Sequence, residues 1–246
     1  MFHTFPTQTG LVNSMKHARR TLFAALVGIA LSAPTACSQS NDSSRSTRRA
    51  ITQSQAIATD FLRTELALSP ETASRLSLER HLGPTAIYQL DNHSQAGFER
   101  RRLVRIELLQ RLQGRPLLPE GHILARDLAV AEAALMDLIA LEQLGYGRFD
   151  YADHRPYAMD AYTGVWIEGP ALLAYSQTIN NVDEATAYIA RLQSLSAAIQ
   201  DTRRRLMADR ASGIVLPRSL ARETARRVDL LMSDDQSALE MIVTAF

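Results

Sequence analysis

The chain has 246 residues, 46% hydrophobic and 22% charged, with 11 glycines and 9 prolines; these globular proportions exclude collagen-like, low-complexity and generally disordered chains. Cys37 is the only cysteine, which excludes an intramolecular disulfide and any cysteine-rich zinc or iron–sulfur site. The net charge is +1, but all 26 acidic and 24 of the 27 basic residues follow position 36; the resulting net charge of −2 argues against a nucleic-acid binder.

Residues 1–36 have the layout of a secretory signal peptide. Lys16, Arg19 and Arg20 precede the apolar run from Leu22 to Leu31, and small residues follow it. That run is shorter than the roughly 20 residues that a transmembrane helix needs. We therefore expect export, with Met15 as the initiator.

Cys37 distinguishes two forms of the exported protein. The Ala36–Cys37 junction is typical of bacterial lipoproteins, so we expect lipid on Cys37. Ser38 next to it favours the periplasmic face of the outer membrane. Pro34 stands where such signals normally have leucine, and the alternative is an incidental thiol in a periplasmic or secreted protein.

The polar residues 37–49 predict a flexible tether between the membrane and a folded domain. From residue 50 to residue 246, apolar residues recur at spacings of three and four, which predicts an all-α fold, a bundle-like array of helices.

The expected helices, in chain order, are one ending near Leu68, a short one over 69–78, and four over 94–113, 119–144, 183–210 and 217–232. The longest are expected at 119–144 and 183–210. Asp183 is the expected N-cap of its helix, and residues 213–216 are expected to form a short extended link.

The helix expected over 94–113 carries apolar residues on one side and arginines on others. Leu103, Ile106 and Leu109 lie on one side. Arg101, Arg105 and Arg111 lie on other sides.

Residues 146–170 lack a sustained helical period and hold four of the seven tyrosines and the only tryptophan. A loop of this length in a compact domain is usually functional or disordered, and the aromatic residues argue against disorder. One interpretation is a cleft wall that binds a peptide-like ligand, with candidate cleft-lining residues Tyr157, Asp160, Tyr162, Trp166 and Glu168. The other is a packed connection whose aromatic side chains fill the core. His154 alone is more typical of a hydrogen-bonding histidine than of a ligand.

Catalytic sequence motifs are absent. The six histidines include no pair four residues apart, so there is no His-Glu-x-x-His zinc motif. There is also no Gly-x-Ser-x-Gly nucleophile turn, phosphate loop or dinucleotide fingerprint. We therefore predict no catalytic residue and no metal ligand.

Three segments resemble the amino-terminal half of the DUF885 family: residues 69–76 (SPETASRL), 164–192 (GVWIEGPALLAYSQTINNVDEATAYIARL) and 211–218 (ASGIVLPR). The resemblance covers about residues 55–235. It implies an exported or lipid-anchored bacterial protein with a zincin-like helical fold similar to that of M32 carboxypeptidases.

The zinc-binding helix of that family lies in the carboxy-terminal half, so zinc is implied for full-length members and no ligand is carried over to this chain. The apolar segment 237–246 adds to the expectation that the domain over 50–246 is truncated.

These observations leave three alternative functions for the chain. The first is the non-catalytic amino-terminal portion of an exported, peptidase-like lipoprotein, inactive alone and partnered by a separately encoded carboxy-terminal half. The second is a self-sufficient helical envelope lipoprotein that binds a peptide or protein through residues 146–170. The third is a metal-free hydrolase that uses the carboxylates of that segment.

Overall fold

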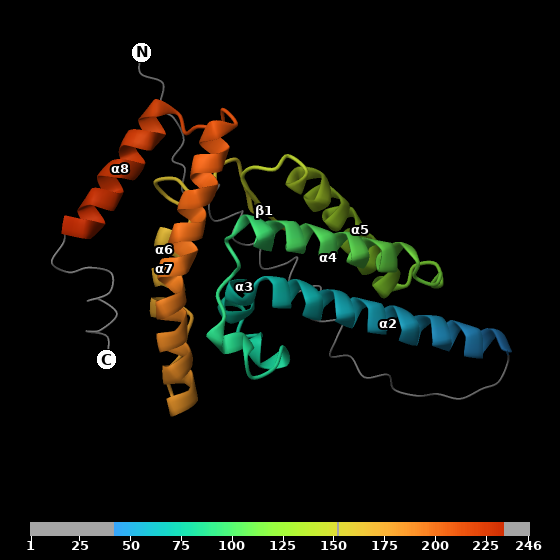
Figure 1. Ribbon diagram of the computed structural model, residues 1–246. Coiled ribbons are helices and arrows are strands. Elements are labelled where there is room, and N and C mark those ends of the chain that lie inside the picture. The colour runs from blue at the N-terminus through green and yellow to red at the C-terminus, as the bar shows by residue number, and fades with distance from the viewer. Residues whose placement is uncertain (1–41, 152, 234–246) are drawn as a thin grey trace, which may run out of the picture. The chain divides into compact units, whose positions relative to one another are not determined.

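The computed structural model describes residues 42–151 and 153–233 (Figure 1). The predicted signal peptide, the lipidation site at Cys37 and the terminal segment 237–246 lie outside these residues. Within them the predicted all-α fold is confirmed: long helices dominate, and the strands form one two-stranded hairpin.

The helices are α2 (Asp42–Leu68), α3 (Pro70–Arg75), α4 (Gln95–Gln113), α5 (Ile123–Glu142), α6 (Val165–Tyr175), α7 (Val182–Ala211) and α8 (Arg218–Ser233), with 3-10 turns η1 (Glu79–His81) and η2 (Ala86–Tyr88). Strands β1 (Arg148–Asp150) and β2 (Asp153–Arg155) pair antiparallel, with Phe149 opposite His154.

The chain forms two compact units, and the long helices α2, α4 and α5 contribute to both. The first unit contains residues 42–62 and 108–136, and the second contains residues 63–107 and the described residues from 137 onward.

The first unit is a helical layer with an apolar interior. Its buried side chains come from all three helices: Ala58, Phe61, Leu62, Leu108, Leu112, Leu124, Leu128, Ala131 and Leu135. Arg111 of α4 forms an ion pair with Asp60 of α2, and Arg115 pairs with Glu132 of α5. Apolar burial therefore stabilises this unit, while its ion pairs lie nearer the surface.

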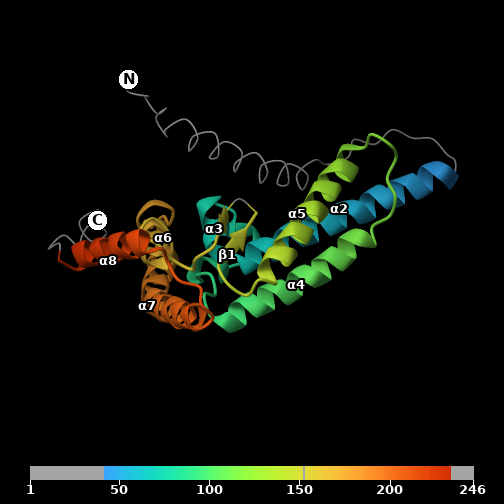
Figure 2. The same ribbon diagram turned by 90° about the horizontal axis from the view of Figure 1, so that it is seen from above.

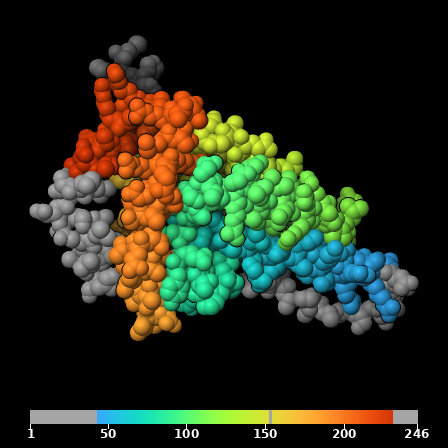
Figure 3. All heavy atoms as spheres, viewed as in Figure 1, coloured from blue at the N-terminus to red at the C-terminus, as the bar shows by residue number. Residues whose placement is uncertain are grey.

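The core of the second unit lies where α6 packs against α7 (Figure 2). Its buried members are Val165, Leu173, Tyr188, Leu195 and Ala198. A Cβ on Gly169 would lie 2.4 Å from Leu195 Cδ1, so a larger residue there would require the Leu195 side chain to move. Figure 3 shows α7 lying directly against the segment that follows α3, and η2 contacts α7 within this unit.

The helix boundaries correct three sequence predictions. Helix α2 begins at Asp42, so residues 42–49 of the predicted tether are helical. Polar, largely exposed residues can extend an existing helix because propagation needs no new nucleus. As a result α2, with 27 residues, exceeds α5, with 20; the longest is α7, with 30. The N-cap of α7 is Asn181, not Asp183, and its side chain accepts a hydrogen bond from Glu184 N at 2.9 Å.

The segment 146–170 is also more regular than predicted. It holds the β1–β2 hairpin and the start of α6, which contains Pro170. Gly164 precedes α6 with a φ of 113°, a conformation that favours glycine. Both residues read as helix breakers in the sequence. Residues 213–216, expected as a short extended link, lie in neither a helix nor a strand, and Gly213 adopts a turn conformation with a φ of 82°.

Candidate functional site

The hairpin and α6 are joined by a partly buried carboxylate. Glu168 accepts hydrogen bonds from both Arg148 of β1 and Arg155 of β2. Burial alone would raise the pKa of Glu168, but the two guanidinium groups outweigh it and lower the pKa to about 2. Glu168 is therefore a fixed anion at neutral pH.

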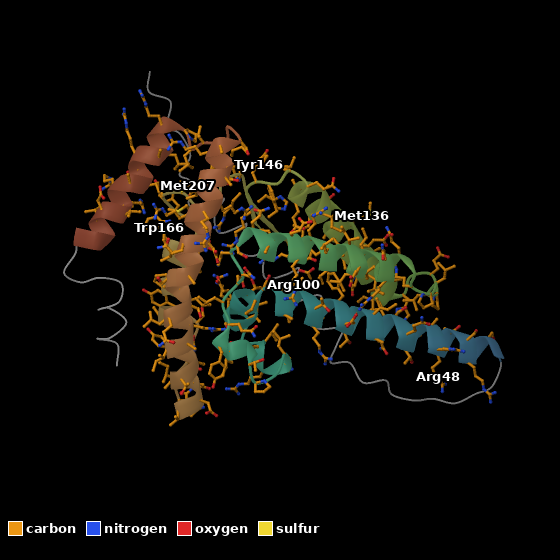
Figure 4. All side chains as sticks on the ribbon, viewed as in Figure 1. Arg48, Arg100, Met136, Tyr146, Trp166 and Met207 are labelled. Carbon is orange, nitrogen blue, oxygen red and sulfur yellow. The ribbon has the colours of Figure 1, made fainter. Side chains whose placement is uncertain are left out.

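The other predicted cleft-lining residues lie before Glu168 on the same segment. The indole Nε1 of Trp166 (Figure 4) donates to the backbone oxygens of Asp160, at 3.1 Å, and Thr163, at 3.2 Å. The carboxylate of Asp160 accepts from Tyr162 N at 2.8 Å. These local bonds bring Asp160, Tyr162 and Trp166 together.

Tyr162 is exposed, with the Arg227 guanidinium 4.4 Å from its ring centroid, and Tyr157 is half-buried. His154 packs edge-on against Phe149. That these residues line a ligand cleft stays a prediction.

A second cluster of buried polar groups joins α3 to the segment before α4. Glu71, 1% exposed, accepts hydrogen bonds from Asp91 N and from Arg75, and its Oε1 lies 3.2 Å from His93 Nε2. The backbone N–H of Glu71 in turn donates to Asp91 Oδ1 at 3.1 Å. This reciprocal pair fixes α3 against the chain 20 residues later.

The pKa values of the two carboxyl groups in this cluster are shifted in opposite directions. Burial raises the pKa of Asp91, and the negative charge of Glu71 raises it further. Burial would also raise the pKa of Glu71, but the hydrogen bond and charge of His93, with Arg75 and Arg148, lower it overall. Arg148 connects this cluster to Glu168, since its NH2 lies 4.0 Å from Asp91 Oδ2.

A third cluster centres on Arg105, which is 1% exposed. Its guanidinium bonds to Glu65 of α2, at 3.0 Å from NH2 to Oε2, and to Glu142 of α5, at 2.5 Å from NH1 to Oε1. Burial would lower the pKa of Arg105, but the two carboxylates raise it. Burial also raises the pKa of Glu142 despite this partner.

Arg191 of α7 is buried without a hydrogen-bonded carboxylate. It donates to the Ser74 hydroxyl at 2.7 Å, to the backbone oxygens of Gln89 and Ala86 at 2.9 and 3.2 Å, and to the Gln177 side chain at 3.2 Å. Arg191 therefore holds α3, η2 and α7 together.

A cavity of about 680 Å³ lies beside these clusters within the second unit. Its walls come from the end of α2, residues 88–93, the first turns of α4 and the middle of α7. Arg100, labelled in Figure 4, and Arg101 line it. Arg101 is 6% exposed, and its Nε has no hydrogen-bond partner.

The buried face of α4 includes two arginines. In the structure Arg101, Arg105, Leu108 and Leu112 are buried, and Leu103 is 52% exposed. The spacing of these four residues is that of a helical stripe, so the signal was present, but its first two members are arginines and read as solvent-facing. Glu71, Asp91 and His93 carried no such signal.

Among residues 42–151 and 153–233, no group of three His, Cys, Asp or Glu side chains is placed to hold a metal ion. No helix in this part of the chain is long and apolar enough to span a membrane. No family model, curated protein or solved structure matches the chain.

Proposed function

We propose that this chain is the non-catalytic amino-terminal helical portion of an exported, peptidase-like DUF885 lipoprotein, anchored through lipid on Cys37 at the outer membrane. It supplies packing and binding surfaces to a zinc-bearing carboxy-terminal half. The observation that carries the proposal is the contact between the segments that resemble the family.

Two of those segments meet in the second unit. Ser74 of the first accepts a hydrogen bond from Arg191 of the second at 2.7 Å, across 117 residues of chain. Glu71 and Glu168, also from these two segments, are connected through Asp91 and Arg148. Residues of two resembling segments thus join, together with Asp91 and Arg148, in one polar framework, which supports a shared fold.

The state of the carboxylates favours a structural role for them. A general acid or base works best with a pKa near the operating pH, whereas the pKa of Glu168 is about 2. Glu65 and Glu71 are buried and bonded to arginine or histidine partners. This argues against a hydrolase that uses these groups directly.

Helix α7 offers a surface for a partner. Val182, Ile189 and Met207 are all exposed, with Met207 63% exposed, and the helical spacing places them on one side of α7, with exposed Ile199 on an adjoining side. Apolar side chains grouped in this way mark interaction surfaces. We assign this surface to the zinc-bearing half.

The test is to mix the full chain with the separately expressed His-Glu-x-x-His-bearing half of a DUF885 protein. We expect co-elution and a higher melting temperature, because a partner that binds only the folded state stabilises it. Ile189→Glu together with Met207→Glu should weaken the complex. Leu117→Glu, at a 96% exposed position of the first unit, should not.

A monodisperse monomer whose melting temperature is unchanged by the added half would contradict the proposal. That result would favour the alternative, a self-sufficient envelope lipoprotein that binds a peptide or protein through residues 146–170.

A further inference from the structure

We propose that one end of the first unit binds a phospholipid surface with anionic headgroups. This basic end consists of the N-terminal turns of α2, with Arg45, Arg48 and Arg49, and of the α4–α5 loop over residues 114–122. The arginines pair with headgroup phosphates, and Leu117 enters the acyl-chain region. The inference goes beyond the proposed function, because the surface assigned to the zinc-bearing half lies on α7.

The arginines of the basic end are exposed and unpaired. Their spacing of three and four residues places Arg45, Arg48 and Arg49 side by side on α2. Arg111 of the same unit pairs with Asp60, whereas these three have no carboxylate partner among the described residues. The partial positive charge at the N-terminal end of α2 adds to theirs. This end of the unit therefore attracts anions.

Exposed apolar side chains gather at the same end. Among the large apolar side chains described in the first unit, the two most exposed are Leu117, at 96%, and Ile123, at 62%. Leu117 lies in the α4–α5 loop, where Pro116 and Pro119 restrict the backbone, and Ile123 begins α5. Leu117 contributes almost no packing to the fold and is free to enter an apolar phase.

The two parts of the basic end lie together in space. Figures 1 and 2 both place the α4–α5 loop alongside the N-terminal half of α2, where α2 extends beyond that loop. Arg48, labelled in Figure 4, lies on the extending part. Cations beside an exposed apolar loop match a membrane surface, where phosphates overlie acyl chains. An extended acidic peptide would pair with the arginines but offers no such apolar layer to Leu117.

The position of this end along the chain also favours a membrane. Asp42, the first residue of α2, follows Cys37 by five residues, which span about 18 Å when fully extended. Lipid on Cys37 would therefore hold the basic end beside the bilayer. An acyl chain together with basic residues gives firmer membrane binding than either alone. In this respect only, the inference rests on the proposed lipid anchor.

Two acidic residues limit the strength of the interaction. Asp42 and Glu120 belong to the same two segments and reduce their net positive charge. Attraction between exposed charges is also screened by salt. We therefore expect binding that is weak without the lipid anchor, that needs anionic headgroups, and that weakens as the salt concentration rises.

The test places an environment-sensitive fluorophore at position 117 of the full chain. Cys37→Ala removes the only native cysteine and any lipid on it, and Leu117→Cys supplies the labelling site. The protein is titrated with vesicles of phosphatidylcholine, alone or mixed equally with phosphatidylglycerol. We expect a blue shift of the emission with the anionic vesicles and a much smaller one with phosphatidylcholine alone. The same label at Val182→Cys, an 80% exposed position of the second unit, should not respond.

A second comparison isolates the arginines. Arg45→Gln, Arg48→Gln and Arg49→Gln together should raise the vesicle concentration needed for half of the emission change by roughly tenfold or more. The matched control changes three exposed arginines of the second unit: Arg203→Gln, Arg210→Gln and Arg218→Gln. The control should leave the titration unchanged. Residues 1–36 are present in every sample, so their own membrane binding cancels in these comparisons.

Several results would overturn the proposal: no emission change at position 117, an equal change on both kinds of vesicle, an equal response at position 182, or equal effects of the two sets of arginine substitutions. A stronger response to polyglutamate than to anionic vesicles would overturn it in favour of an acidic protein partner. The zinc-bearing half takes no part in this experiment, so its failure is distinguishable from a failure of the proposed function.

Discussion

Replacing Arg105 with methionine is expected to destabilise the protein by about 3–5 kcal/mol, because it leaves two buried carboxylates without their shared cation. Glu65 is 4% and Glu142 8% exposed at the side chain, and both bond to this guanidinium. Methionine fills a similar volume but supplies neither charge nor donor. The free energy of unfolding, measured by urea denaturation at neutral pH, tests this.

The matched control is Arg102→Met on the same helix, where the side chain is 29% exposed and pairs with Glu99. We expect a change of about 1 kcal/mol or less there, as for other surface pairs. Adding Glu65→Leu and Glu142→Leu to Arg105→Met should recover much of the loss, because no unpaired charge remains. Equal costs for Arg105→Met and Arg102→Met would contradict the assigned role of Arg105.

Acid is expected to weaken the hairpin by protonating Glu168. The folded-state pKa of Glu168, about 2, lies below its ordinary value of 4.5. Its ion pairs therefore contribute their full stability above pH 4.5 and lose it as the pH falls toward 2. By linkage, the contribution at neutral pH is about 3 kcal/mol. Nearly buried pairs with Arg148 and Arg155 account for this size.

Comparing the unaltered protein with Glu168→Gln isolates this effect from other acidic groups. The variant should be less stable at neutral pH, because two largely buried arginines lose their anion. The difference in unfolding free energy should shrink between pH 4.5 and pH 2, where the unaltered carboxylate is itself protonated. A difference that stays constant with pH would mean that Glu168 is not held as an anion by these arginines.

The sequence predicted the helical fold because apolar spacing reflects a local period. Helices α4, α5, α7 and α8 lie within four residues of their expected ends. Helix α6 was missed because Pro170 and two nearby glycines locally oppose helix formation, while contact of Gly169 with Leu195 favours it through packing.

The buried polar framework could not be predicted in the same way. Its pairs join residues far apart in sequence, such as Glu71 with Asp91 and Ser74 with Arg191. No local pattern specifies such pairs. Glu168 was proposed from the sequence as a cleft-lining residue, which stays a prediction, and its partners Arg148 and Arg155 were not identified.

The burial of Arg101 and Arg105 could be predicted in part from the sequence. Both continue the stripe of Leu108 and Leu112 on α4. Charged residues usually face solvent, so the two arginines were not recognised as part of the buried stripe. The partners that make the burial of an arginine tolerable come from other helices and cannot be seen in the local sequence. The cavity beside Arg101 is lined by parts of α2, α4 and α7 and by residues 88–93. Because these segments are far apart in the chain, no sequence pattern predicts it.

The proposal that this chain binds and positions a partner without catalysing a reaction is tested by a peptide-hydrolysis assay. The full chain should be assayed at neutral pH with added zinc, alone and with the His-Glu-x-x-His-bearing half, against a mixture of short peptides. The account predicts no turnover above buffer for the chain alone, and turnover by the complex that exceeds that of the added half by itself. Hydrolysis by the chain alone would contradict it.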